Sequence, residues 1–404
     1  MLKVAIVGCG KIADSHLEQL ARIPGCRVVA ACDREPLMAR QLAERFKIPQ
    51  HFSDVKEMLK VAAPVVVHVT TPPESHFPIA KICLEAGSHV YVEKPFTLDT
   101  VEAEALIDLA EKKAREITVG HDLQFSHAAR RMRKLVDEGF LGGKPVHMES
   151  YYCYDLSDAK YARALLANKQ HWVRKLPGQL LHNVISHGIA RMAEFLTTDH
   201  PQVLVCGYSS PLLASMGENE LTDELRVIIN DQNRTTAYFT FSSQMRPSLN
   251  AFRLYGPRNG LVLDEDQQSV IPIRGSRYKS YAEKFIPPLY FARQHLVNLA
   301  ANVRLFMRND FHMKAGMKCL IESFYRSISE GAPAPIPYRQ ILLTSRIMDE
   351  IFKQLNSRNS GSSVTAVTAP GSLKASDADC PSASALNGHT NVKLDLEAQA
   401  GRIS

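Results

Sequence analysis

The sequence predicts an α/β protein with a doubly wound parallel sheet at the N-terminus and a C-terminal α+β domain with an open, largely antiparallel sheet. In the first 120 residues, short β-branched apolar runs alternate with amphipathic helical patterns, as buried parallel strands alternate with their crossover helices. After Phe125, longer segments alternate polar and apolar residues with a period of two. That period is typical of strands with one covered face.

Length and composition set the class of protein. The chain has 404 residues, enough for two to three domains with their own cores. Its 45% hydrophobic and 22% charged residues are ordinary for a globular enzyme. Apolar runs stay well short of about 18 residues, so no membrane-spanning helix is expected. The net charge of +6 is mild and gives no strong case for a nucleic-acid partner.

Cysteine usage indicates a reducing compartment. None of the eight cysteines forms a CxxC pair, and several lie inside apolar runs. We therefore expect reduced, mostly buried thiols in a cytoplasmic protein, with neither a disulfide framework nor a zinc module. The chain starts directly with an apolar strand pattern, so secretion is not expected.

The first domain is expected over residues 1–125. Its predicted strands are Val4–Val7, Val28–Cys32, Val65–Val69, His89–Val92 and Ile117–Val119. Its predicted helices are Lys11–Arg22, Glu35–Phe46, Ile79–Ala86 and Val101–Lys113.

The second domain is expected over residues 126–356. It begins with a helix over Ala128–Glu138 and ends with helical patterns over His312–Glu330 and Pro337–Leu355, and helices are expected on one side of its sheet. Asp231–Arg234 is typical of a hairpin turn. The predicted strands are Pro145–Tyr154, Val203–Ser209, Glu224–Asn230, Thr235–Phe241, Asn250–Tyr255, Gly260–Leu263 and Ser269–Ile273.

The last 48 residues, 357–404, differ in composition. They contain nine serines and no aromatic residue. Such a segment does not bury enough apolar surface to offset the entropy of ordering, so a disordered tail is predicted.

A glycine-rich turn, Gly8 to Ala13, follows the first strand and opens the first helix. Gly8 allows the tight turn, Gly10 lets a pyrophosphate approach the backbone, and the small Ala13 permits close packing of helix on strand. The helix N-terminus, at Lys11 and Ile12, then faces the anion. The pattern predicts a dinucleotide site on a Rossmann domain.

Asp33 ends the second strand, 20 residues after Ala13. Its carboxylate is placed to accept hydrogen bonds from the adenosine ribose and to repel a 2′-phosphate, which favours NAD over NADP. The neighbouring Arg34 could instead bind a 2′-phosphate, so NADP stays an alternative.

Two further loops, Thr70–His76 and Glu93–Pro95, follow expected strands where such sheets bind ligands. With them the sequence resembles the Gfo/Idh/MocA oxidoreductases, the group of glucose-fructose oxidoreductase and inositol dehydrogenase. The resemblance rests on the glycine turn, the TPP-x-x-H loop, the AGSHVYVEKP segment and the YGPRNGLVLD strand pair. With the PIPY helix it covers about residues 1–356.

The resemblance implies a nicotinamide-dependent enzyme that forms dimers or tetramers, with Lys94 beside the nicotinamide and the substrate hydroxyl. It also implies a cis bond before Pro95. The cofactor-binding residues expected are Gly8, Gly10, Lys11, Ile12, Ala13, Asp33, Arg34, Thr71, Pro72, His76, Glu93 and Lys94.

The family's second signature, GG-x-L-x-D-x-x-x-H in outline, corresponds to Gly178–His187. Asn183 and His187 are four residues apart and share a helix face. His182 and His187 lie about 140° apart, which makes a shared metal a poor interpretation, and no metal is expected. We assign His187 as acid/base, Lys94 as the electrostatic partner that polarises the hydroxyl, and Asn183 as an orienting group.

Two departures from the family pattern stand near this site. The family commonly has Asp where Asn183 stands, and Asn carries no proton; His182 could take part of that role. Many relatives have Asn and Arg where Asp122 and Gln124 fall, a segment expected to border the substrate.

The only tryptophan, Trp172, lies in a segment that precedes the catalytic helix. With Arg174 it forms either a clamp for a sugar face and an anion or a solvated loop with one packed ring. The substrate-binding residues expected are Lys94, Asp122, Gln124, Trp172, Arg174, His182, Asn183 and His187.

Three functions fit these residues. The first is an NAD(P)-dependent dehydrogenase for a secondary alcohol of a sugar, cyclitol or nucleotide-sugar. The second is an enzyme that retains NAD during glycoside cleavage or epimerisation. The third is a non-catalytic dinucleotide-binding sensor. A homo-oligomer and a small-molecule carbohydrate substrate are expected.

The stretch from Arg274 to Arg308 carries seven cations and one carboxylate, Glu283. Within it, Leu289–Met307 has an apolar helical stripe, which Pro287 and Pro288 would start. Two roles are open for this segment. Its stripe packs on the second domain or a partner subunit, or residues 289–307 contact an anionic membrane surface.

Overall fold

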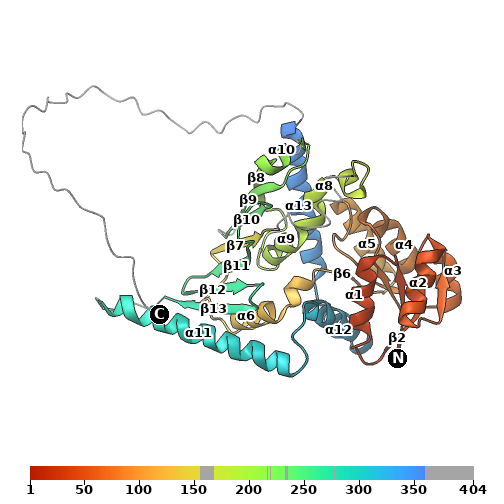
Figure 1. Ribbon diagram of the computed structural model, residues 1–404, viewed down its shortest axis with the longest axis horizontal. Coiled ribbons are helices and arrows are strands. Elements are labelled where there is room, and N and C mark those ends of the chain that lie inside the picture. Colours follow the sequence, from red (N-terminus) through yellow and green to blue (C-terminus); the bar gives the residue numbers. More distant parts are fainter. Residues whose placement is uncertain are drawn as a thin grey trace, which may run out of the picture. The chain divides into compact units, whose positions relative to one another are not determined.

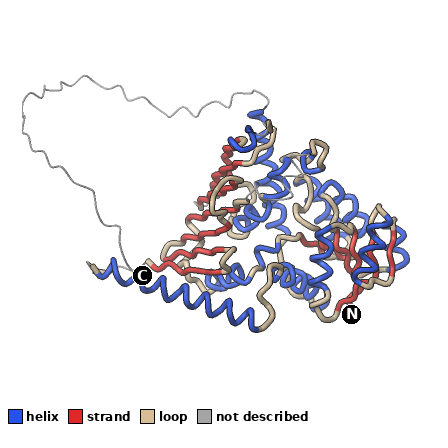
Figure 2. Tube along the Cα trace, in the orientation of Figure 1, coloured by secondary structure: helices blue, strands red, loops and turns tan. Residues whose placement is uncertain are grey.

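The computed structural model describes residues 1–154, 168–215, 217–218, 220–232, 235–275, 278–279 and 281–359. Two sheets with helices packed on them account for most of these residues (Figures 1 and 2). One is parallel and the other largely antiparallel, which confirms the predicted fold class.

The first sheet has six strands in the described residues, in the order β3-β2-β1-β4-β5-β6. Every pair in it is parallel. The strand order reverses between β1 and β4, which is where sheets of this kind bind ligands. The strands are β1 (Leu2–Val7), β2 (Cys26–Cys32), β3 (Gln50–Phe52), β4 (Val66–Val69), β5 (His89–Val92) and β6 (Ile117–Val119).

The crossover helices follow the predicted pattern with one addition. They are α1 (Lys11–Leu20), α2 (Pro36–Phe46), α3 (Val55–Ala62), α4 (His76–Glu85) and α5 (Thr100–Lys112), and the 3-10 helix η1 (Pro73–Ser75) precedes α4. The sequence did not predict β3 and α3. The strand β3 has only three residues, Gln50 and His51 are exposed, and so no apolar run marks it.

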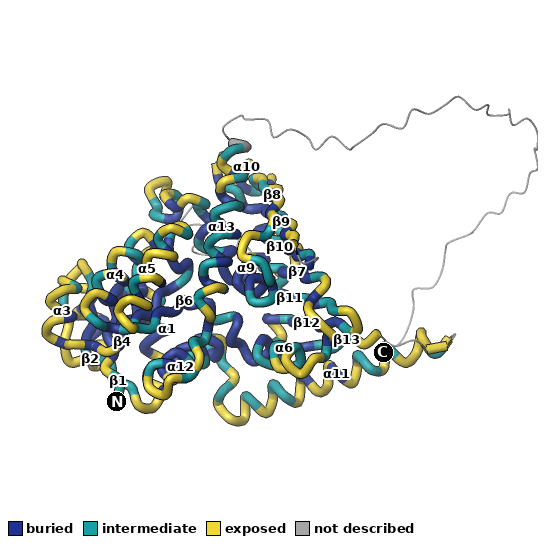
Figure 3. The backbone as a smooth tube through the Cα atoms, turned by 180° about the vertical axis from the view of Figure 1, so that it is seen from behind, coloured by how far each residue is buried: buried dark blue, intermediate teal, exposed yellow. Residues whose placement is uncertain are grey.

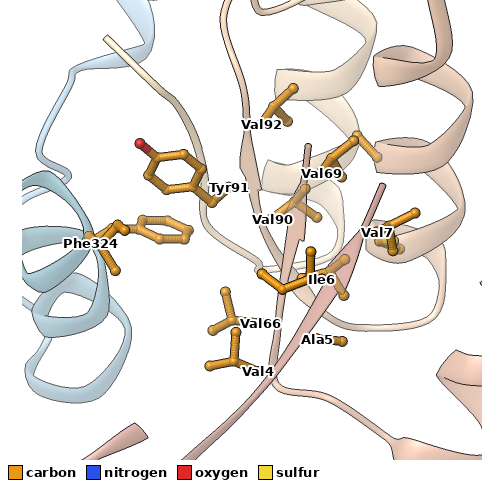
Figure 4. Packing of buried hydrophobic residues seen from close by; sticks show 14 of the residues in the cluster. Val4, Ala5, Ile6, Val7, Val66, Val69, Val90, Tyr91, Val92 and Phe324 are labelled. Atoms are coloured by element: carbon orange, nitrogen blue, oxygen red, sulfur yellow. The ribbon is translucent and has the colours of Figure 1, made fainter. Parts of the chain in front are cut away.

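The core of the first sheet includes a helix from late in the chain. Val4–Val7 and Val90–Val92 are buried. Phe324, on α12 (Ala315–Glu330), packs against Tyr91 of β5 with ring centroids 6.3 Å apart (Figure 4). Part of the segment assigned by sequence to the second domain therefore completes the first core.

The second sheet has seven strands among the described residues, in the order β13-β12-β11-β7-β10-β9-β8. Its pairs are antiparallel except β7 with β10, which are parallel. The strands are β7 (His147–Tyr152), β8 (Gln202–Tyr208), β9 (Glu224–Asn230), β10 (Thr236–Ser242), β11 (Asn250–Tyr255), β12 (Asn259–Asp264) and β13 (Ser269–Arg274).

One face of this sheet is covered and the other is open. Phe239 and Leu254 pack in one buried cluster with Ile189 of α9 and Ile351 of α13. Leu204, on the opposite face, is exposed. The remaining helices are η2 (Asp122–Phe125), α6 (His127–Asp137), η3 (Trp172–Lys175), α8 (Gln179–Val184), α9 (Ser186–Ala193), α10 (Pro211–Ser215) and α13 (Tyr338–Asn359).

The basic segment forms α11 (Ala282–Met307), which runs beside β13 (Figure 1). It begins seven residues before the predicted start at Leu289. Pro287 and Pro288 lie inside it rather than at its start, so the prediction of its beginning was wrong. In the part of the chain that the structure describes, no helix has the length and apolarity needed to cross a membrane.

Two predicted features fall wholly or partly outside the described residues. The turn Asp231–Arg234 includes 233 and 234, which are not described. The helix α13 continues to Asn359, three residues into the segment predicted as a tail, and residues 360–404 are not described.

Candidate active site

The glycine turn joins β1 to α1 at the point where the strand order reverses. Gly8 has φ +95°, and a Cβ there would lie 2.7 Å from both the Thr70 carbonyl carbon and Thr71 Cγ2. Glycine is therefore required between β1 and the loop after β4. Ala13 is fully buried, as the predicted packing of helix on strand requires.

Gly10 faces open space instead. Of the described atoms beyond its chain neighbours, none lies within 4 Å of a Cβ built at Gly10. The first N–H groups of an α-helix have no intrahelical partner, and α1 begins directly after Gly10. The turn therefore leaves room for an anion at a helix N-terminus, and these residues fit the pyrophosphate of a dinucleotide.

Asp33 follows β2 and is fixed by the backbone around it. Its Oδ2 accepts a hydrogen bond from the Cys9 N–H at 2.7 Å, and its Oδ1 accepts one from the Glu35 N–H at 3.0 Å. A carboxylate thus lies directly beside the glycine turn, where the ribose of a dinucleotide is expected. Arg34 is exposed.

His76 connects the two loops that follow β4 and β5. Its Nε2 lies 2.8 Å from the Thr71 carbonyl oxygen and its Nδ1 lies 2.8 Å from the Pro95 carbonyl oxygen. Burial lowers the pKa of His76. The neutral ring has one N–H, so it donates to one of these two carbonyl oxygens. Pro72, in the first of the two loops, is exposed.

Glu93 ends a chain of buried polar side chains. Its Oε1 lies 2.7 Å from Nε2 of His16, the Nδ1 atoms of His16 and His68 are 2.8 Å apart, and His68 Nε2 lies 2.8 Å from the Tyr325 hydroxyl. The second oxygen, Oε2, accepts from the Lys94 N–H at 3.1 Å. Although burial opposes the charge, the hydrogen bond from His16 and the Lys94 charge leave the pKa of Glu93 below its ordinary value.

Hydrogen bonds connect every member of this series. An ionised Glu93 accepts from His16 Nε2–H, and one hydrogen bond joins the Nδ1 atoms of His16 and His68. A hydrogen bond between His68 Nε2 and the Tyr325 hydroxyl ends the series. Burial holds the pKa of His68 well below its ordinary value, so this ring is neutral. The chain fixes the loop that carries Lys94.

Lys94 extends from this loop to Asn183 on α8. The bond between Lys94 and Pro95 is cis, as the resemblance implies. The ammonium donates to the Asn183 carbonyl oxygen at 2.9 Å and lies 3.4 Å from Asn183 Oδ1. Burial lowers the pKa of Lys94, while the charges of Glu93 and Asp122 oppose that effect.

His187 lies on α9, whereas Asn183 lies on the preceding helix α8, so the single helix face predicted for the two residues is divided at Ile185. His187 is 8% exposed. Its Nδ1 is 3.8 Å from Asp122 Oδ1, too far for a hydrogen bond, and this atom has no other partner among the described residues. Burial, aided by the positive charge of Lys94, holds the pKa of His187 well below its ordinary value. The ring is therefore neutral at pH 7.

Asp122 lies between His187 and Lys314. Its Oδ1 is 3.8 Å from His187 Nδ1, and its Oδ2 is 3.9 Å from Lys314 Nζ. Burial raises the pKa of Asp122 to about 6, and Lys314 limits the rise. The carboxylate is thus largely ionised at pH 7.

A cavity of about 400 Å³ opens beside Asp122. Its lining includes the carboxylates of Asp122, Glu265 and Asp266, together with apolar side chains from the loop between α11 and α12. The lining residues are Asp122, Leu123, Ser126, His127, Asn250, Glu265, Asp266, Gln268, Phe311, His312, Met313, Ala315 and Gly316.

Of the eight residues predicted to bind substrate, Asp122 alone lines this cavity. Lys94, Asn183 and His187 are not part of its lining, and the other four make contacts elsewhere. Gln124 is buried and donates to the Ala190 carbonyl oxygen and to Glu194. His182 is buried, stacks on Phe352 and has its pKa lowered to about 4 by burial. Arg174 forms a paired contact with Glu218 at 2.9 and 3.1 Å. Trp172 stacks on His171 and is not part of the cavity lining.

Sequence reasoning missed Arg191, which lies four residues after His187 on the same helix face. It is 2% exposed, donates to Asn250 Oδ1 at 2.5 Å, and its guanidinium lies 5.9 Å from the ring of Tyr152. Its Nε and Nη1 have no partner among the described residues. The i, i+4 spacing of His187 and Arg191, both on α9, was the available signal.

The described residues hold neither a cluster of metal-ligand type nor a disulfide. Within the described ranges, no group of three or more His, Cys, Asp or Glu side chains is arranged to hold a metal ion. The described cysteines are free thiols: Cys9, Cys26, Cys32, Cys83, Cys153, Cys206 and Cys319.

Comparison with known proteins adds the family of the first domain. Residues 2–121 match the family model GFO_IDH_MocA, described as an oxidoreductase family with an NAD-binding Rossmann fold. D-glucoside 3-dehydrogenase of Escherichia coli is 32% identical over 142 residues, which are 35% of this chain and 40% of that protein. UDP-N-acetylglucosamine 3-dehydrogenase of Acidithiobacillus ferrooxidans is 30% identical over 149 residues, 37% of this chain and 44% of that protein. The matches thus span less than half of these relatives.

Solved structures share the fold over most of the chain. An NAD-binding oxidoreductase from Klebsiella pneumoniae gives a TM-score of 0.71 at 17% identity and covers 88% of this chain and 97% of its own. The WlbA dehydrogenase of Bordetella pertussis, solved with NADH and UDP-GlcNAcA, gives 0.70 at 13% identity, with 88% and 96% covered. At such identities the likeness concerns the fold.

Proposed function

The chain belongs to the Gfo/Idh/MocA oxidoreductases through its N-terminal domain, and from this premise we propose that it is an NAD(P)-dependent dehydrogenase. Its substrate is a secondary alcohol of a sugar, cyclitol or nucleotide-sugar. The observation that carries the proposal is the meeting of Lys94, Asn183, His187 and Asp122, which belong to three separate segments of the chain. Of these four, Asp122 also lines a cavity of about 400 Å³.

The nicotinamide bound at the glycine turn supplies the hydride acceptor in one direction and the donor in the other. The chain's own residues supply proton transfer and charge. His187 takes the hydroxyl proton, because its neutral ring has a nitrogen lone pair free to accept it. Lys94 stabilises the alkoxide character that develops on the same oxygen.

Asn183 orients Lys94, and Asp122 supplies a negative charge. The main-chain carbonyl oxygen of Asn183 accepts a hydrogen bond from the Lys94 ammonium, which fixes the position of that positive charge. Asp122 stabilises the imidazolium that His187 becomes after proton uptake, since a carboxylate lies 3.8 Å from the ring. The negative charge that relatives carry at position 183 is in this way supplied from η2.

NAD is the preferred cofactor in this proposal. Asp33 is fixed beside the turn by two backbone N–H groups and repels a 2′-phosphate. We expect NAD to bind at least about tenfold tighter than NADP, which is about 1.4 kcal/mol. Titration of both cofactors by fluorescence quenching measures the ratio, and equal or reversed affinities would show that Arg34 governs the pocket.

The substrate class is supported by the cavity and by the relatives. Carboxylates of Asp122, Glu265 and Asp266 accept hydrogen bonds from hydroxyl groups. The two relatives above are dehydrogenases of a glucoside and of a nucleotide-sugar. The proposal also includes a cytoplasmic homo-oligomer.

The test is an assay of NADH release run beside product analysis, on a panel of sugars, cyclitols, aldonates and nucleotide-sugars. Net NADH together with an oxidised product supports the dehydrogenase. An altered product without NADH indicates the enzyme that retains NAD, and neither indicates a non-catalytic sensor. Lys94→Ala should lower turnover by about a hundredfold or more while cofactor binding persists. Lys175→Ala, at an exposed position, is the matched control.

A further inference from the structure

The helix α11 attaches to the protein through polar side chains. Gln294 Nε2 donates to the Pro272 carbonyl oxygen, and Asn298 bonds both the N–H and the carbonyl oxygen of Val270, each at 2.9 Å. Asn302 donates to the Gln267 carbonyl oxygen at 2.9 Å. These residues recur every four positions, so one polar row of the helix covers the edge of β13.

The apolar side chains of α11 point the other way. The buried residues of α11 are Gln294 and Asn298, both polar. Leu289 is 72% exposed and Phe306 is 69% exposed, and Figure 3 shows most of this helix exposed. The large apolar residues of the helix that are exposed are Phe285, Ile286, Leu289, Leu296, Val297, Leu299, Val303, Phe306 and Met307.

This arrangement is the reverse of an ordinary surface helix, which buries its apolar stripe. At 100° per residue the exposed apolar side chains, from Phe285 to Met307, cover about half of the helix circumference along about 33 Å of its length. The seam of a two-stranded coiled coil is narrower. A wide apolar face exposed along a whole helix marks an interaction surface.

The charges of α11 indicate which kind of partner it fits. Arg293 and Arg304 are exposed within the apolar face, near one of its edges, and Lys284 lies near the start of the helix. The helix has one carboxylate, Glu283, whose Oε2 accepts from the Tyr278 N–H. A second copy of α11 would bring three more cations and one carboxylate against the three cations and one carboxylate of the first copy, so like charges would meet. An anionic surface, by contrast, attracts all three cations of the helix.

We propose that α11 lies on an anionic lipid surface, with its apolar face in the headgroup and acyl boundary and its cations on phosphate groups. A helix of this pattern binds in the plane of the interface, which agrees with the finding that no described helix has the properties needed to cross a membrane. The segment after α11 leads into the cavity beside Asp122, since Phe311, His312 and Met313 line it. Binding would thus hold the cavity near the lipid. Binding of α11 to lipid requires neither the cofactor nor the substrate, so it can be tested independently of the proposed activity.

The test is sedimentation of the full chain with phosphatidylcholine vesicles, with and without phosphatidylglycerol, at low and high salt. The wild-type protein should sediment with anionic vesicles at low salt and much less at high salt. Leu296→Glu with Val303→Glu should abolish binding. Val61→Glu with Val101→Glu adds the same charge at two other exposed apolar positions, and should bind as the wild type does.

A second pair of variants tests the charges. Arg293→Gln with Arg304→Gln should weaken binding to anionic vesicles about thirtyfold, at about 1 kcal/mol for each cation. All variants should keep the wild-type melting temperature, because the altered side chains are exposed. Failure of the wild type to bind either kind of vesicle overturns the proposal. A second result also overturns it. If the protein forms a dimer without lipid, binds no vesicle, and is dissociated by Leu296→Glu with Val303→Glu, then α11 is a subunit interface.

Discussion

Asp122 is the residue on which the electrostatics of the site depend most. It contacts His187 and Lys314 at 3.8 and 3.9 Å, and the charges of Lys94, Glu93 and Glu265 also act on it. Burial raises its pKa from 3.8 to about 6. The protein therefore holds a charged carboxylate at pH 7 in a place that favours the neutral form.

The first prediction concerns stability. The pKa of Asp122 is higher in the folded protein than in the unfolded chain. Its contribution to the free energy of unfolding is therefore fully present below about pH 4 and is lost as the pH rises through 6. Asp122→Asn stays neutral, so its free energy of unfolding relative to the wild type should rise between pH 4 and pH 8. The rise is at most about 3 kcal/mol, from about two pKa units at about 1.36 kcal/mol each. Urea unfolding at both pH values measures it. Asp108→Asn, at an exposed carboxylate, should show no such rise.

The second prediction concerns the carboxylate that lies near His187. Asp122→Asn should lower turnover by about ten- to a hundredfold and remove the loss of activity below pH 6, because the imidazolium of His187 loses its partner. Adding Asn183→Asp should restore part of the rate, because it returns a carboxylate to the same site. Asn183→Asp alone should change the rate modestly. A wild-type pH profile in Asp122→Asn would exclude this role for Asp122.

At the scale of elements, the two glycines of the turn between β1 and α1 have different roles. Gly8 is required by the fold, because its φ is +95° and a Cβ would overlap the loop after β4. Gly10 has an ordinary φ of −77° and open space beside it. Folding and cofactor binding are therefore separable within three residues.

The third prediction uses this pair. Gly10→Ala should keep the melting temperature of the cofactor-free protein while NADH binding falls by at least about tenfold, since the methyl group fills the space of the pyrophosphate. Gly8→Ala should lower both the melting temperature and the affinity, because its backbone is strained and crowded. Circular dichroism and NADH fluorescence measure the two properties. Equal loss of stability in both variants would show that Gly10 also has a structural role.

At the scale of the whole molecule, the open face of the second sheet carries exposed apolar side chains that suit it to self-association. Leu204 pairs with Ile228, and Ile228 pairs with Tyr238, in the register of β8, β9 and β10. These side chains are 64%, 45% and 47% exposed. They form an apolar row across three strands, which is a surface that a second subunit can cover.

The fourth prediction is that the protein forms a dimer or tetramer through this row. Ile228→Lys should shift the sedimentation profile toward the monomer, because it places a charge in the centre of an apolar contact. Val101→Lys, at an exposed apolar position on α5, should leave the profile unchanged. A wild-type protein that is monomeric at micromolar concentration would contradict the prediction.

The sequence alone determined the elements that local patterns mark. Strands such as β5 and β9 have the predicted bounds, because buried and half-buried strands leave apolar runs or alternation in the sequence. The dinucleotide turn was also predictable, since Gly8, Gly10 and Asp33 occupy one βαβ unit. The sequence also named Lys94 and Asn183 as site residues, and the structure places the Lys94 ammonium 2.9 Å from the Asn183 main-chain carbonyl oxygen.

Only the tertiary structure decided the features that depend on residues far apart. The carboxylate beside His187 is Asp122, 65 positions earlier, and the chain that holds Glu93 ends at Tyr325, which is 257 positions from His68. The helix α12 packs in the first core, and α11 turns a polar row toward the protein. Local periodicity reveals which residues share a face, but which face is buried depends on the surface that the rest of the chain presents to it.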